Sequence, residues 1–150
     1  MSIQQQLNNI LRRKDAQLHA IAKDICSAIK EKLQENLKRY WYDGYSPKSY
    51  TRTWELFDSI EGTIERNKSC DYTIRVFFDP DKIHAVQNDD GWNSHMGFDS
   101  QAFTSGLVSS IEDGVGGSYN NPRHGSAAHM IEFTEQWAQT YARQLLRERL

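Results

Sequence analysis

The sequence predicts an α+β fold with a long N-terminal helix, a small curved antiparallel sheet built on a β-hairpin, and a long C-terminal helix. Apolar residues recur at helical spacing from Ile3 to about Tyr40. They then alternate with a period of two over residues 72–78, and they return to helical spacing after Ser126. A chain of 150 residues with this order of elements is expected to form a single domain over residues 1–150.

The first helix is expected over residues 3–40, because neither proline nor glycine interrupts its apolar stripe. The stripe consists of Ile3, Leu7, Ile10, Leu11, Leu18, Ile21, Ile25, Ile29, Leu33 and Leu37. A helix of roughly 38 residues is about 57 Å long, which exceeds what a domain of this size can cover. We therefore expect either a break near Arg12–Asp15, where the stripe is weakest, or a first part that projects or packs on another subunit. Gly44 and Pro47 should end the helix.

The sheet region is expected over residues 59–86. Strands at 59–66 and 72–78 should pair as a hairpin, because a polar link with turn chemistry joins them. Residues 82–86 are a candidate third strand. Just before the sheet, residues 49–57 could form a short helix with aromatic side chains on one face, and such spacing is typical of core packing. These aromatics are Tyr50, Trp54 and Phe57.

The second half of the chain is expected to hold a long loop and two helices. Residues 87–101 are polar and lack periodicity, and loops of this length are usually functional or disordered. A short helix should cover residues 103–111 and stop at the glycines of 114–117. Ser126 is a plausible N-cap for the last helix, expected over residues 126–149.

The charge balance and the cysteines limit the function classes. Eighteen Lys+Arg against 20 Asp+Glu give a net charge of −2, so no basic field indicates nucleic-acid wrapping. Cys26 lies in the helical stripe and is interpreted as an apolar filler, and its spacing from Cys70 suggests neither a disulfide nor a zinc site. We expect neither a signal peptide nor a membrane partner, because the N-terminus lacks the required pattern and no apolar run is long enough.

The strongest candidate for catalysis is a set of histidines and aspartates. It comprises His84, His95, His124, His129, Asp89, Asp90, Asp99 and Asp113. The spacing from His124 to His129 does not place both rings on one helix face, and no Glu occupies the zincin position. No serine has the sequence context of a nucleophile elbow, and the glycines at 114–117 lack the ending of a phosphate loop. We therefore expect surface or interface histidines, no metal, no cofactor and no enzyme.

Two motifs carry a family resemblance. The first runs from the Tyr-Ser-Pro of residues 45–47 to the Leu-x-x-Ser-Ile of residues 56–60, and the second is the Ile-Glu-x-Gly of residues 111–114. They resemble motifs of the tail-completion proteins (neck, or head–tail joining, proteins) of long-tailed bacteriophages and prophages. The matching positions are Tyr45, Pro47, Thr53, Leu56, Ser59, Ile60, Glu112 and Gly114. Trp54 and Val115 depart from the pattern, since the family usually has a small residue and a threonine there.

The resemblance implies a structural virion protein that forms a ring between the connector of the DNA-filled head and the tail. Implied partners are further copies of the chain, connector or stopper proteins, and tail terminator or tail tube proteins. Genomic DNA would pass through without specific binding, which suits a mildly acidic chain. The protein would be assembled in the host cytoplasm and reside in the virion neck. Alternatives are a tail terminator or another phage adaptor of similar fold, and a metal-dependent hydrolase that uses His95, His124 and His129.

Ring interfaces need apolar and aromatic anchors within a polar surface. The candidate interface residues are Trp41, Tyr42, Tyr50, Trp92 and Phe98. Tyr45 belongs to the same aromatic group. The alternative is that these side chains fill the core of a single chain.

Overall fold

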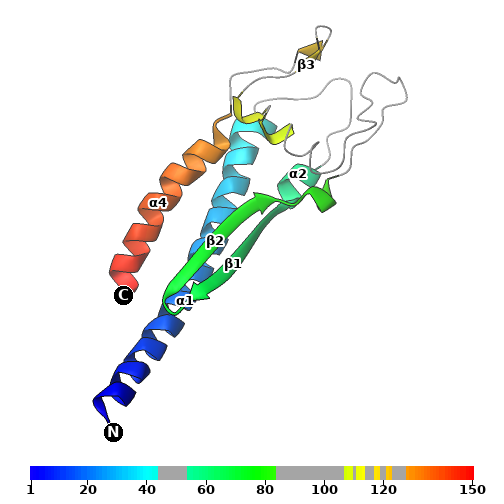
Figure 1. Cartoon of the computed structure of the whole chain (residues 1–150). Coiled ribbons are helices and arrows are strands. Elements are labelled where there is room, and N and C mark those ends of the chain that lie inside the picture. Colours follow the sequence, from blue (N-terminus) through cyan, green and yellow to red (C-terminus); the bar gives the residue numbers. More distant parts are fainter. Residues whose placement is uncertain (44–53, 84–106, 110, 114–116, 119–120, 123–127) are drawn as a thin grey trace.

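The computed structural model describes residues 1–43, 54–83, 107–109, 111–113, 117–118, 121–122 and 128–150. The elements follow in the order α1 (Ile3–Leu37), the π-helix η1 (Lys38–Tyr42), α2 (Glu55–Asp58), β1 (Ile60–Lys68), β2 (Asp71–Phe78), the 3-10 helix η2 (Pro80–Lys82), β3 (Gly117–Ser118), β4 (Asn121–Pro122) and α4 (Met130–Arg149). Figure 1 shows α1 as the axis of the molecule, with the β1–β2 hairpin and α4 packed along it. The predicted α+β class is confirmed.

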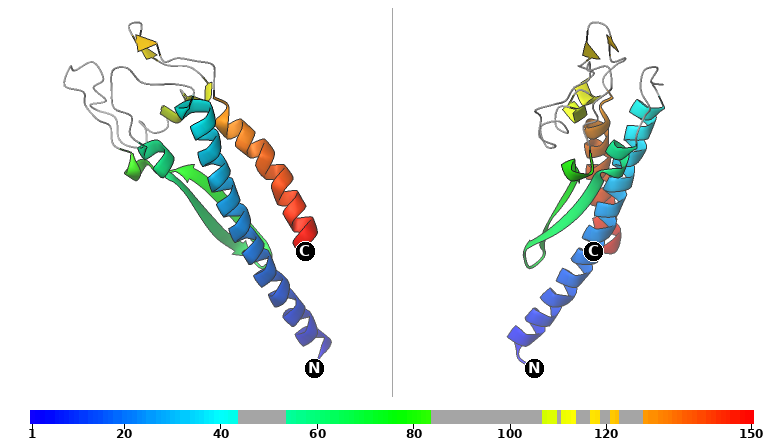
Figure 2. Two further views of the ribbon diagram at one scale, coloured as in Figure 1. Left: turned by 180° about the vertical axis from the view of Figure 1, so that it is seen from behind. Right: turned by 90° about the vertical axis from the view of Figure 1, so that its right-hand side faces the viewer.

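Helix α1 is continuous, so a break near Arg12–Asp15 is not found and the first part projects instead (Figures 1 and 2). A capping box starts the helix: the Ser2 hydroxyl accepts from the Gln5 amide, and the Gln5 side chain accepts from the Ser2 amide. At its other end, the Asp43 amide donates to the Lys38 carbonyl at 2.8 Å, which carries the helical path through η1 to Tyr42.

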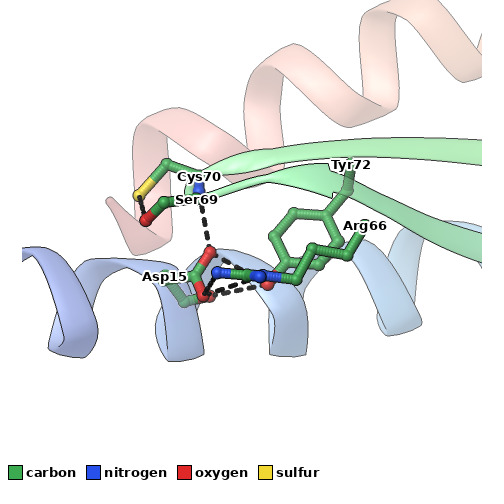
Figure 3. Close-up of polar contacts among 5 residues, drawn as sticks. All are labelled: Asp15, Arg66, Ser69, Cys70 and Tyr72. Atoms are coloured by element: carbon green, nitrogen blue, oxygen red, sulfur yellow. Dashed lines mark hydrogen bonds and ion pairs between the residues drawn. The ribbon is translucent and has the colours of Figure 1, made fainter.

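Asp15 explains why the apolar stripe weakens without breaking the helix (Figure 3). Its Oδ1 accepts from the backbone amide of Cys70 at 2.7 Å and from the Tyr72 hydroxyl at 3.0 Å. Its Oδ2 accepts from the guanidinium of Arg66 at 3.0 Å. The hairpin turn therefore rests on a polar residue of α1, and these contacts hold the pKa of Asp15 below its usual value, with the Cys70 amide as the main cause.

The hairpin pairs antiparallel from Ile60–Phe78 to Lys68–Asp71, with a bulge near its turn. The turn residue Cys70 has a φ of 58°. A third strand beginning at Lys82 is wrong, because residues 80–82 form η2, in which the Asp79 carboxylate accepts from the Asp81 amide. Residues 84–86 lie outside the described residues. The remaining pair, β3 with β4, joins Gly117 to Pro122 and Ser118 to Asn121.

Helix α4 lies antiparallel beside α1, as both views of Figure 2 show. The buried Asn36 amide donates to the Thr134 hydroxyl at 2.9 Å, and Arg149 pairs with Asp24 near the far end. The helix begins at Met130 and not at 126, because His129 adopts a left-handed φ of 48° immediately before it. Ser126 lies outside the described residues.

The core gathers where the end of α1 meets α2, the start of β1 and the start of α4. Its buried apolar residues are Leu33, Leu37, Tyr42, Leu56, Ile60, Ile83, Ile111, Ala128 and Met130. Residues 107–109 and 111–113 are helical, within the range predicted for the short helix and just beyond it. Phe57 packs against the core as predicted, whereas Trp54 is 45% exposed although its ring stacks on Tyr42 and meets Phe57 edge-on.

Candidate interaction surfaces

The Leu-x-x-Ser-Ile motif lies inside the molecule. Leu56, Ser59 and Ile60 are buried, and the Ser59 hydroxyl donates to the Leu56 carbonyl at 2.7 Å. The Ser59 carbonyl accepts from the Asp79 amide at 2.7 Å, which ties the start of β1 to the residue that follows β2. This motif therefore ends α2 and starts the hairpin.

Glu112, from the second motif, holds the start of α4. Its carboxylate accepts from the backbone amides of Ile131 at 2.9 Å and Glu132 at 3.0 Å. The first amides of a helix have no partners within the helix and carry partial positive charge. Glu112 supplies the cap that the His129 side chain does not provide. The sequence did not predict this role.

The structure places part of the predicted interface set within the core. Tyr42 is 5% exposed and stacks on Trp54 with ring centroids 4.3 Å apart, and Trp41 packs against the same core. Both side chains therefore contribute to the core of the single chain, which was the alternative to an interface role. Seven predicted residues lie outside the described residues: Tyr45, Pro47, Thr53 and Gly114 from the motifs, and Tyr50, Trp92 and Phe98 from the interface set.

An aromatic patch that the sequence did not single out lies where α1 ends beside α4. Tyr40 and Phe133 are each 38% exposed, and their ring centroids are 5.1 Å apart. The ring of His129 lies 6.0 Å from that of Phe133. Only the packing of α4 shows that the ring of Phe133 reaches solvent.

The N-terminal segment, defined as residues 1–14, is exposed at every position. Its apolar side chains form one stripe and are each about half exposed or more: Ile3, Leu7, Ile10 and Leu11. The segment carries Arg12, Arg13 and Lys14 and has no acidic residue. It is therefore an amphipathic, basic helix end that its own chain leaves uncovered.

A groove of about 730 Å³ lies between α1, β2 and α4. Its apolar lining includes Ile29, Leu33, Ile74, Val76, Phe78 and Ile131. Among the described residues that line it are three carboxylates, from Glu112, Asp113 and Glu135, and neither lysine nor arginine. The described lining of the groove is thus mostly apolar, with carboxylates from residues 112–113 and from α4.

The described residues contain no group of three or more His, Cys, Asp or Glu side chains that could hold a metal ion. His129 pairs with Glu132 at 3.2 Å, and Asp113 accepts from the Ser109 hydroxyl. The other members of the predicted set, His84, His95, His124, Asp89, Asp90 and Asp99, lie outside the described residues. Cys26 is buried, as predicted for a filler, and burial raises the pKa of its thiol.

None of the helices in the described part of the chain is both long and apolar enough to cross a membrane. No curated protein and no solved structure matches the chain. The model of the YomN family, which derives from phages and prophages, matches residues 4–148. This match extends from the first turn of α1 to the last turn of α4 and supports the phage origin that the motifs indicated. The chain therefore belongs to the YomN family of phage- and prophage-derived proteins.

Proposed function

We propose that this protein is a structural component of the phage neck, without catalytic activity, that forms a ring joining the DNA-filled head and its connector to the tail. Its phage family and its tail-completion-like motifs support this role. The observation that carries the proposal is the uncovered apolar stripe of the N-terminal segment. A stripe of this kind on a projecting helix is typical of a protein that buries it against a partner.

Four exposed aliphatic side chains supply the energy of the proposed contact: Ile3, Leu7, Ile10 and Leu11. Burying an aliphatic side chain of this size contributes about 1.5–3 kcal/mol. The four side chains lie on the same face of α1 as the residues from Leu18 onward that pack against the rest of the chain. Because they share one face, a single surface of a partner can cover all four. A single chain lacks this stabilisation because the four side chains are exposed, whereas an assembled ring would bury them and gain it.

The partners of the proposal are further copies of the chain, a connector or stopper protein on the head side, and a tail terminator or tail tube protein on the tail side. The exposed Tyr40–Phe133 pair lies toward the opposite end of α1 from the N-terminal segment. Two contact surfaces at opposite ends suit a component that joins two bodies. A net charge of −2 also suits passage of DNA, because binding to DNA strengthens with the number of phosphates that a protein neutralises.

The first test measures the mass of the purified chain in solution, alone and with the connector complex of its own phage, by native mass spectrometry and sedimentation. We expect a discrete ring, either alone or on the connector, and labelling of the chain at the head–tail junction of complete virions. A chain that remains monomeric and binds neither connector nor tail would contradict the neck role. Binding to purified tails but not to DNA-filled heads would favour a tail terminator.

A further inference from the structure

The groove and the N-terminal segment complement each other in shape and charge. The segment presents a row of aliphatic side chains followed by three basic residues, whereas the groove has an apolar lining with three carboxylates beside it. We propose that the groove of each copy binds the N-terminal segment of a second copy. This contact would form the interface between neighbouring subunits of the ring, so the inference rests on the proposed neck function. It can nevertheless be tested with the purified chain alone.

The segment does not reach the groove of its own chain. Leu11 and Ile29 belong to one uninterrupted helix and lie roughly 27 Å apart along its axis. Figure 1 shows the N-terminus projecting away from the region where α1, β2 and the start of α4 converge. A straight helix cannot fold back on itself, so the N-terminal segment can reach only the groove of another copy.

Charge favours this arrangement over pairing of two N-terminal segments with each other. Parallel pairing would bring Arg12, Arg13 and Lys14 of both copies together without an acidic residue of either segment to offset them. In the groove, the same cations would approach carboxylates. Among the described residues, Glu135 has no hydrogen bond or ion pair, and its side chain remains free to meet a cation.

Several apolar side chains of the groove lining remain partly accessible to a partner. Ile29, Ile74, Val76 and Phe78 are only partly buried within one chain, and they face the groove from α1 and β2. Helix-in-groove recognition reads aliphatic anchors at i, i+3, i+4 and i+7. Ile3, Leu7, Ile10 and Leu11 occupy such spacings. Because the two surfaces differ, the contact is head-to-tail, and its repetition either closes a ring or extends a filament.

Two full-length variants test the contact from its two sides. Leu7→Lys with Ile10→Lys places charge in the stripe, and Glu135→Lys with Ala138→Arg places two cations at the groove, so the two altered surfaces repel each other. Each variant alone should lose self-association by about a hundredfold or more, measured as the dissociation constant by sedimentation. Mixed in equal amounts, they should form a one-to-one dimer and nothing larger, because one intact groove meets one intact segment.

Matched controls carry similar charge changes away from the contact. Asn8→Lys with Asn9→Lys alters the polar side of the segment, and Gln136→Lys with Gln139→Arg alters exposed positions of α4 outside the groove lining. Both controls should retain self-association within a few-fold. Circular dichroism and thermal melting of every variant establish that the fold is intact.

Three outcomes would overturn this contact. They are undiminished self-association of the groove variant, a mixture that yields no one-to-one dimer, and a wild-type chain that stays monomeric at every concentration. None of them alone removes the neck function, because binding of the wild-type chain to its connector is measured separately. Conversely, self-association that follows these expectations without any binding to connector or tail would support the contact and contradict the neck role.

Discussion

At the scale of single residues, Gly62 marks a close approach between the hairpin and α1. A Cβ at Gly62 would lie 2.6 Å from the Cys26 sulfur, a separation that forces one of them to move. We predict that Gly62→Ala lowers the free energy of unfolding by about 1–3 kcal/mol, as overpacking does. Urea denaturation measures the change, and Thr63→Ala at the next, exposed position serves as the control.

A second variant identifies the cause. Cys26→Ala removes the sulfur, so the combination of Cys26→Ala with Gly62→Ala should be more stable than the sum of the two single changes by about 1 kcal/mol. Strict additivity would show that the clash with Cys26 is not the source of the effect.

Glu112 is the second residue whose role is specific and testable. Glu112→Ala leaves the amides of Ile131 and Glu132 without their acceptor. Loss of a helix cap costs about 0.5–2 kcal/mol, and we predict a destabilisation in this range by thermal or urea unfolding. Asp113→Ala, at the adjacent exposed carboxylate that accepts from the Ser109 side chain, should cost less. Equal losses would contradict a capping role.

At the scale of elements, one carboxylate fastens the hairpin turn to α1. The folded-state pKa of Asp15 is lowered by the Cys70 amide, the Tyr72 hydroxyl and Arg66. A lowered pKa stabilises the fold above the unfolded value of about 3.9, and this stabilisation is lost as the pH falls through the folded value. We predict that wild type is more stable than Asp15→Asn at pH 7, and that the difference shrinks below about pH 4. Urea midpoints at pH 7, 4 and 3 measure it.

Glu61 is the matched control for this pH dependence. Its pKa is also lowered, first by Lys82 and then by Lys30, but it joins β1 to η2 and α1 away from the turn. The Asp15→Asn variant keeps Glu61, so its folding stability should still fall at low pH by the amount that Glu61 contributes. A stability difference between wild type and Asp15→Asn that stays constant down to pH 3 would contradict the assignment.

The packing of α4 on α1 includes one buried polar pair. Asn36 donates to Thr134, whose hydroxyl in turn donates to the Met130 carbonyl. Thr134→Val leaves the Asn36 amide buried without its acceptor, and we predict a loss of about 1–3 kcal/mol in the free energy of unfolding. Replacing both partners, as in Asn36→Leu with Thr134→Val, should restore part of that loss. A double variant that is less stable than either single variant would contradict this account.

At the scale of the whole molecule, the fold and the N-terminal segment are separable. Residues 1–14 are exposed, and the contacts with the hairpin begin at Asp15. We predict that deleting residues 1–13 changes the unfolding free energy of the monomer by less than about 1 kcal/mol while abolishing self-association. Urea unfolding at a concentration where wild type is monomeric measures the first effect, and sedimentation measures the second. A truncated chain that fails to fold would show that the segment supports its own domain.

The order and type of the long elements could be predicted from the sequence, because each rests on a local pattern. The stripe from Ile3 to Leu37 and the alternation of Tyr72, Ile74 and Val76 each produce one regular element, whatever the rest of the chain does. Helix length alone predicted either a break or a projecting first part, and the continuous α1 of the structure decides for the projection. The boundaries near 82 and 126 were wrong, because single side chains set them: the Asp79 carboxylate, and the left-handed His129 backed by Glu112.

The sequence by itself thus determined the class of the fold and the chemistry of the N-terminal segment, since these depend on periodicity and residue type. Only the tertiary structure decided which surfaces remain open. Burial depends on contacts between distant elements, so it alone places Tyr42 in the core and leaves Tyr40 and Phe133 at the surface. For the same reason, only the structure brings Ile29, Val76 and Glu135, from three separate elements, into the groove that complements the helix end.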